Sequence, residues 1–173
     1  YYLVHSTIAA AALFLVADVV ARRRGASADS ASPGPDFAER AGAGLLFMAA
    51  AIATTGLPPL SGFIGKLLIL KSVAALPDWG WAWGVILGTT FIGVIGLARA
   101  GSVVFWKVAP DADAAPAPLA ARADFAAPVI ALLLLAALSA GAGWASAYAN
   151  AAAAQVLDPT LSAAVVLGEE AAP

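Results

Sequence analysis

The sequence predicts an all-α polytopic membrane protein. Hydrophobic residues fill 62% of the 173 positions and charged residues only 12%, and the mean hydropathy is +0.88, which lies outside the range of ordinary soluble domains. Apolar segments of about 20 residues or more, the length that a helix needs to cross a bilayer, alternate with polar segments. The pattern favours four transmembrane helices, the second of which is broken.

Composition also excludes several kinds of function. The chain has no cysteine, which excludes disulfides, thiolate metal sites and cysteine nucleophiles. The formal net charge of −2 offers no basic surface for nucleic acid. The sequence contains no motif for a metal, a nucleotide or a cofactor. We therefore expect a protein that works in the lipid bilayer without a cofactor and is not an enzyme.

The first element is an apolar run over residues 1–21, about as long as a spanning helix. It lacks the basic flank and the cleavage site of a signal peptide, and we expect the chain to be the C-terminal piece of a longer polytopic protein. Residues 22–40 follow with three consecutive arginines and then Ser, Pro and Gly. This composition predicts a loop.

Residues 41–76 form one apolar stretch that is too long for a straight spanning helix. At about 1.5 Å per residue the stretch measures about 54 Å, against about 30 Å for the hydrocarbon core. It contains Gly56, Pro58, Pro59 and Gly62, and the prolines lack an N–H and clash with the preceding turn. We expect a transmembrane helix broken at Gly-Leu-Pro-Pro. Irregular backbone at membrane depth is tolerated where it lines a wet cavity, as in many transporters.

Two further spans complete the prediction. Residues 80–107 begin beside three tryptophans and end on a Trp-Lys pair, which are residues that favour the two membrane interfaces. A linker rich in Ala, Pro and Asp covers residues 108–123 and leads to the last span, over residues 124–149. Residues 150–173 form a weakly amphipathic, acidic tail.

Lysine and arginine predict the orientation. They gather between the first and second spans and between the third and fourth, whereas the short turn between the second and third spans has none. By the positive-inside rule, the basic loops face the cytoplasm. Both ends of the chain, including the acidic tail, then lie on the outer side.

Ionisable residues at membrane depth are the main functional candidates. Lys66 stands four residues after Gly62, about one turn into the second half-helix, where it can bind and release a proton. The alternative for Lys66 is a structural pair or a side chain that snorkels to an interface. His5, the only histidine, suits a proton shuttle because its charge changes near neutral pH. A lone histidine in an apolar helix is, however, often a packing residue.

Five further polar residues are weaker candidates for a relay or an electrostatic partner: Lys71, Arg99, Asp18, Thr55 and Thr89. Lys71 lies further out and either snorkels or relays. Asp18 stands four residues before Arg22, which favours a local ion pair. Arg99 stays charged and either pairs with a carboxylate or snorkels. Threonine hydroxyls in membrane helices usually bond the backbone one turn earlier.

Three segments resemble a known family: HSTIAAAALFLVADVV, GLPPLSGFIGKLLILK and GLARAGSVVFW. They are similar to the C-terminal third of the antiporter-like subunits of respiratory complex I and of the Mrp-type (Mnh, Pha) multisubunit cation/proton antiporters. The resemblance covers residues 1 to about 107 and is strongest to the D subunit of the Mrp type. It implies a fourteen-helix antiporter-like fold in which the four spans are helices eleven to fourteen.

The resemblance also implies residue roles. The family's helix twelve is broken at a Gly-Leu-Pro element, and its proton-carrying Lys or Glu falls on Lys66; the histidine of helix eleven falls on His5. The implied partners are other membrane subunits, and the implied ions are protons and Na+ or K+. The implied location is a bacterial cell (inner or plasma) membrane, which the subunit crosses several times. Two alternatives stay open: a proton-pumping subunit of an NADH:quinone oxidoreductase, and a structural membrane segment.

Overall fold

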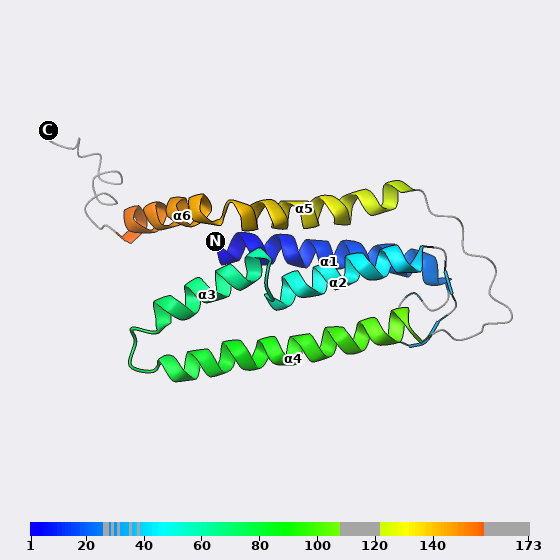
Figure 1. Cartoon of the computed structure of the whole chain (residues 1–173), viewed down its shortest axis with the longest axis horizontal. Helices are drawn as coiled ribbons and strands as arrows, with labels where there is room; N and C mark the ends of the chain where they lie inside the picture. Colours follow the sequence, from blue (N-terminus) through cyan, green and yellow to red (C-terminus); the bar gives the residue numbers. More distant parts are fainter. Residues whose placement is uncertain are drawn as a thin grey trace, which may run out of the picture.

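The chain is helical throughout most of the part that the structure describes (Figure 1). The computed structural model describes residues 1–25, 28, 30, 32–34, 36–37, 39–107 and 122–157. The helices are α1 (Tyr2–Arg24), α2 (Arg40–Thr55), α3 (Ser61–Val73), α4 (Trp79–Phe105), the short 3-10 helix η2 (Arg122–Phe125), α5 (Ala126–Ala140) and α6 (Ala142–Leu157). The all-α prediction is confirmed for these residues. Most of the predicted linker 108–123, and the tail beyond Leu157, lie outside the described residues.

Helix α1 lies at the centre of the bundle. It contacts α2, α3 and α5, and Figure 1 shows α2 and α5 running alongside it, while α4 lies along α2 and α3. The buried apolar positions at these contacts are mostly small: Ala9, Ala12, Val16, Ala43, Ala50, Ala53, Ala131 and Leu135. Small side chains let helix backbones approach closely, which is how helices in membranes gain packing contacts.

Within the described residues, two helices are long and apolar enough to cross a membrane singly. These are α1, with 23 residues, and α4, with 27; α5 and α6 make a third candidate if the bent pair is one span. Helix α2 has 16 residues and α3 has 13, about 24 Å and 20 Å, so each is shorter than the hydrocarbon core of about 30 Å. Four transmembrane helices therefore stay a prediction, with two or three candidate spans in the described part of the chain.

The last predicted span differs from the structure. One transmembrane helix is predicted over residues 124–149, whereas α5 and α6 meet at Gly141 with a bend of 78°. Glycine weakens a helix interior, and the Ser139 hydroxyl donates to the Leu135 carbonyl at 2.9 Å, a contact that often bends helices. Helix α6 then continues to Leu157, into the predicted tail.

The Gly-Leu-Pro-Pro element lies between α2 and α3. Gly56 ends α2 in the left-handed conformation, with φ 69° and ψ 40°. Its N–H donates to the Ala53 carbonyl at 3.0 Å, and the N–H of Leu57 donates to the Ile52 carbonyl at 3.1 Å. These two bonds form a Schellman motif, which satisfies carbonyls that the end of a helix leaves free. The two prolines that follow cannot continue the helix.

Gly62, in the first turn of α3, allows α1, α2 and α3 to meet at one point. A Cβ atom built on Gly62 would lie 2.6 Å from Nε2 of His5, 2.7 Å from the Ala53 carbonyl oxygen and 2.9 Å from Cα of Gly56. Two of these three atoms belong to the backbone and cannot move independently of their helices. The close approach therefore requires glycine at this position.

We predict that Gly62→Ala separates these helices and destabilises the protein. Overpacking a tight contact costs about 1–3 kcal/mol, so the thermal unfolding midpoint of the purified protein in detergent should fall. Gly96→Ala in α4 is the control, because a Cβ there meets nothing within 4 Å. Equal midpoints for the two variants would contradict the packing argument.

Candidate functional site

Lys66 connects the end of α2 with the middle of α4. Its Nζ donates to the carbonyl oxygen of Thr55 at 2.7 Å and to Oγ1 of Thr90 at 2.5 Å. Thr55 is the last residue of α2, so its carbonyl has no partner within the helix. The C-terminal end of a helix also carries a partial negative charge, which favours a cation. The Lys66 amine thus completes the capping of α2 that the Schellman motif begins.

Both acceptors of the Lys66 amine are neutral oxygens. In the residues that the structure describes, every ion pair joins an arginine to a carboxylate: Arg22 to Asp18, Arg23 to Glu39 and Asp124, and Arg40 to Asp36. An ammonium group has three N–H donors, and Lys66 uses two of them in these contacts. The amine is therefore held in place by oxygens that carry no formal charge.

A cavity of about 330 Å³ opens beside Lys66, between α2, α3 and α4. The polar residues that line it are Tyr2, Thr54, Thr55, Lys66, Thr89 and Thr90. All four threonine hydroxyls donate to a carbonyl one turn earlier, at 2.7–2.8 Å, which leaves their oxygen lone pairs able to accept. The volume exceeds that of one water, about 30 Å³. The cavity can therefore hold several waters against hydroxyl acceptors.

His5 lies on a different side of the same break. Its side chain is 1% exposed, and its Nδ1 lies 2.8 Å from Oγ of Ser61, the first residue of α3. The ring of Tyr2 is 5.8 Å from the His5 ring, measured between centroids, and Tyr2 also lines the Lys66 cavity. Tyr2 is therefore near both of the strongest predicted candidates.

The weaker candidates divide into two groups. Thr55 and Thr89 line the Lys66 cavity, and Thr55 contributes its carbonyl rather than its hydroxyl to the lysine. Lys71 and Arg99 are exposed and lie outside that lining. Asp18 forms an ion pair with its i+4 neighbour at 2.8 Å, which is the local pairing that the spacing favours.

Thr90 and Ser61 contact the two main candidates but are not among the site residues that the sequence predicts. Thr90 lies 24 positions from Lys66, and Ser61 lies 56 positions from His5, so only helix packing brings each pair together. The sequence does carry one signal for Thr90. It belongs to the Thr89-Thr90 pair of α4, and Thr89 is one of the predicted candidates.

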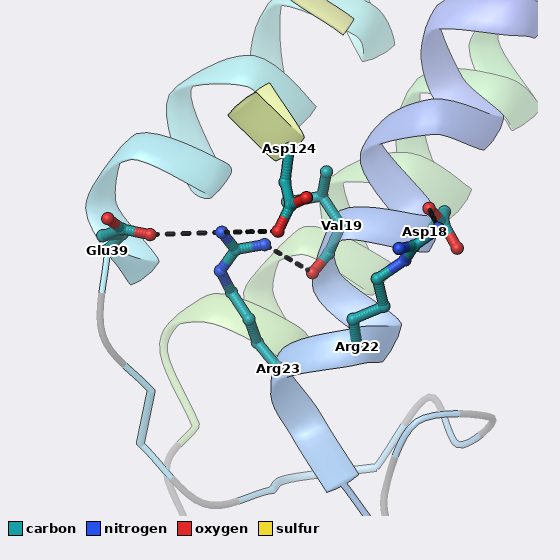
Figure 2. Close-up of polar contacts among 6 residues, drawn as sticks. All are labelled: Asp18, Val19, Arg22, Arg23, Glu39 and Asp124. Atoms are coloured by element: carbon teal, nitrogen blue, oxygen red, sulfur yellow. Dashed lines mark hydrogen bonds and ion pairs between the residues drawn. The ribbon is translucent and has the colours of Figure 1, made fainter. Parts of the chain in front are cut away.

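Arg23 forms a separate polar cluster toward the C-terminal end of α1 (Figure 2). Its guanidinium donates to the Val19 carbonyl at 3.0 Å and to Oε2 of Glu39 at 3.2 Å. Oδ2 of Asp124 lies 3.9 Å away, and the Phe125 ring centroid is 4.5 Å from the guanidinium carbon. One buried arginine therefore joins α1 to the start of α2 and to η2, which leads into α5.

Comparisons with known proteins place these features in a family context. The family model described as "NADH:quinone oxidoreductase/Mrp antiporter, TM" matches residues 1–96. The chain is 32% identical over 135 residues to the D subunit of a probable K(+)/H(+) antiporter of Rhizobium meliloti (strain 1021), covering 61% of this chain and 25% of the relative. It is 28% identical over 169 residues to the D subunit of a Na(+)/H(+) antiporter of Bacillus subtilis (strain 168), covering 98% of this chain and 34% of the relative.

The chain thus spans about a quarter to a third of the length of these curated relatives. No solved structure matches it significantly. The family match covers α1, α2, α3 and most of α4, and so includes both Lys66 and His5.

We predict that Arg23→Leu destabilises the protein more than Arg22→Leu. Removing the buried cation leaves Glu39 and Asp124 unpaired, which costs about 3–5 kcal/mol when both partners are buried. These carboxylates are 41% and 31% exposed, so water offsets part of the cost and we expect about 1–3 kcal/mol.

Arg22 is the matched control, because Figure 2 shows its side chain turned away from this cluster toward Asp18. The Arg22–Asp18 pair is 65% and 53% exposed, and exposed pairs contribute at most about 1 kcal/mol. Thermal midpoints in detergent compare the two variants. An equal loss in both would show that the Arg23 cluster stabilises no more than a surface pair.

Proposed function

The chain belongs to the NADH:quinone oxidoreductase/Mrp antiporter transmembrane family, and we propose that it forms part of a membrane subunit of a monovalent cation/proton antiporter. In this proposal it supplies one section of a proton path that runs through Lys66. The observation that carries the proposal is the Lys66 amine itself: it lies at a helix break, on two neutral oxygens, beside a cavity lined by hydroxyls.

The surroundings of Lys66 suit a group that gains and loses a proton. An ammonium fixed by a carboxylate would be held in its charged form, whereas carbonyl and hydroxyl oxygens accept from it without adding a formal charge. Waters in the cavity can take a proton from Lys66 and return one. Because the amine is part of the helix cap, it stays at the same place while its charge changes.

Thr90 can bond Lys66 in both charge states. With Lys66 charged, Thr90 accepts from Nζ at 2.5 Å while its own hydroxyl hydrogen points to the Ile86 carbonyl at 2.7 Å. When the amine is neutral, Nζ carries a lone pair, and rotation of the hydroxyl lets Thr90 donate to it. Thr90 would therefore hold the amine in position throughout a cycle of protonation.

His5 is the second proton-transfer group of the proposal. It is buried with a hydroxyl on one ring nitrogen, and its ring is 5.8 Å from that of Tyr2, which lines the Lys66 cavity. A proton passing from one group to the other would use the Tyr2 hydroxyl or waters beside it. Lys71 and Arg99 are left outside this path because they lie outside the cavity lining.

The names of the relatives support the proposed ions and the proposed partner subunits. One is named for K+ and H+ and the other for Na+ and H+, so the exchanged cation is Na+ or K+ in this proposal. Both are named as subunits, which supports other membrane subunits as partners. Helices α2 and α3 would form one broken span beside α1 and α4, in a multi-pass subunit of a bacterial inner membrane.

A second candidate function is a proton-pumping subunit of an NADH:quinone oxidoreductase. The observation that favours it is the family description, which joins these oxidoreductases with the Mrp antiporters. The two functions differ in their source of energy. An antiporter responds to an imposed cation gradient, whereas the oxidoreductase subunit moves protons only while NADH is oxidised.

We predict that Lys66→Ala abolishes antiport by the assembled complex. The measurement uses inverted membrane vesicles that carry an imposed pH gradient and no NADH, after assembly of the complex has been verified. The fluorescence of a pH-sensitive dye reports how far the gradient falls when Na+ or K+ is added. Lys71→Ala is the matched control, since Lys71 lies on the same helix but is exposed. Antiport by Lys66→Ala at the wild-type rate would refute the role of this lysine.

We also predict that Thr90→Val slows antiport and that Thr89→Val has a smaller effect. Both changes remove a hydroxyl from the cavity, but only Thr90 bonds the lysine. A hydrogen bond to a charged group contributes about 1.5–3 kcal/mol, so a loss of about tenfold or more is expected for Thr90→Val. The same vesicles provide the rates, and Thr90→Ser should restore most of the activity. Equal losses at both threonines would assign no special role to Thr90.

A further inference from the structure

A narrow apolar groove runs between α2 and α4, next to the Lys66 cavity. Its volume is about 260 Å³, and it is lined by apolar side chains and glycines from both helices, from Gly44 to Leu57 on one side and from Val94 to Trp106 on the other. Thr55 and Leu97 line both the groove and the Lys66 cavity. We propose that this groove holds one acyl chain of a bilayer phospholipid, with the lipid phosphate at Lys107.

The length of the groove matches one leaflet of a bilayer. From Gly44 to Thr55, α2 advances about 16 Å at about 1.5 Å per residue. The hydrocarbon core is about 30 Å thick, so an acyl chain anchored at one interface reaches about 15 Å into it. An acyl chain lying along α2 from that interface would therefore end near Thr55.

The small volume of the groove excludes a helix as the occupant. Its volume is about 260 Å³, whereas about 16 Å of a helix about 10 Å wide would fill about 1,250 Å³. A single polymethylene chain is slender enough to enter the groove. A helix with its side chains is about 10–12 Å wide. A neighbouring helix could cover the groove but could not enter it.

The two ends of the groove differ in the way that the headgroup and the acyl end of a phospholipid differ. Trp106, which is 70% exposed, lies at one end and is followed by the exposed Lys107. Tryptophan and lysine favour the headgroup region, and lysine binds phosphate as a point charge. The other end, at Thr55 and Leu97, lies against the Lys66 cavity. A phospholipid fits this arrangement in one orientation only.

An acyl chain in the groove would form a wall of the Lys66 cavity. Its end would lie against Thr55 and Leu97, where the two spaces meet, and would keep waters of the cavity from spreading along α2 and α4. This consequence rests on the proposed proton path, whereas the binding of the lipid does not.

The test is photo-crosslinking in vesicles of phosphatidylethanolamine and phosphatidylglycerol that contain the whole complex. Trace phosphatidylglycerol with a diazirine on its acyl chain is added and activated, and mass spectrometry maps the labelled residues. We expect Met48 in the groove to carry severalfold more label than Phe91 and Ile92, which are 67% and 70% exposed on α4.

Two variants test whether the label at Met48 comes from a lipid in the groove. Ala98→Phe fills the groove from α4 and should remove the excess label at Met48, and Lys107→Gln should lower it severalfold. Ala136→Phe, at an exposed position of α5 outside the groove, is the control and should leave it unchanged.

Two results would overturn the proposal. Label at Met48 no greater than at Phe91 would show no preference for the groove, and an excess that persists in Ala98→Phe would place the lipid elsewhere. Labelling does not depend on transport. A complex without antiport activity but with specific label would refute the proposed function alone, and active antiport without specific label would refute the lipid site alone.

Discussion

Backbone carbonyls in apolar surroundings must find donors within the protein, and this constraint acts at the end of α2. Gly56 and Leu57 satisfy two of the free carbonyls, and the Lys66 amine satisfies that of Thr55. The prolines create the break, the break exposes the carbonyls, and a carbonyl holds the lysine. The break between α2 and α3 therefore positions the amine that we propose to carry protons.

The features that the sequence predicted depend on local chemistry. Two adjacent prolines beside a glycine disfavour a continuous helix on local grounds, so the sequence predicts a break near Thr55, and two long apolar runs predict helices where α1 and α4 lie. The contact of Lys66 with Thr90 depends on how α4 is rotated against α3, which no local pattern specifies. The bend at Gly141 lies at a glycine that follows a serine bonded to the backbone. Neither residue lowers the hydropathy of the segment enough to predict the bend.

Two cations of this chain show how partners decide the role of a charge. Arg23 lies among two carboxylates and an aromatic ring, and arginine keeps its proton at any physiological pH. It is suited to hold helices together. Lys66 bonds only neutral oxygens in its described contacts. A lysine in such surroundings is suited to change its charge without disrupting its neighbours.

The Arg23 cluster also bears on the order of biosynthesis. Asp124 follows Arg23 by about 100 residues, which a ribosome adds in about 5–20 s. During that interval Glu39 is available to the arginine and Asp124 is not, so α1 and α2 can associate first. Helix α5 then arrives at a partly satisfied guanidinium whose remaining donors attract its leading end. With this order of synthesis, a charge that is already in place would select the register of α5 against α1.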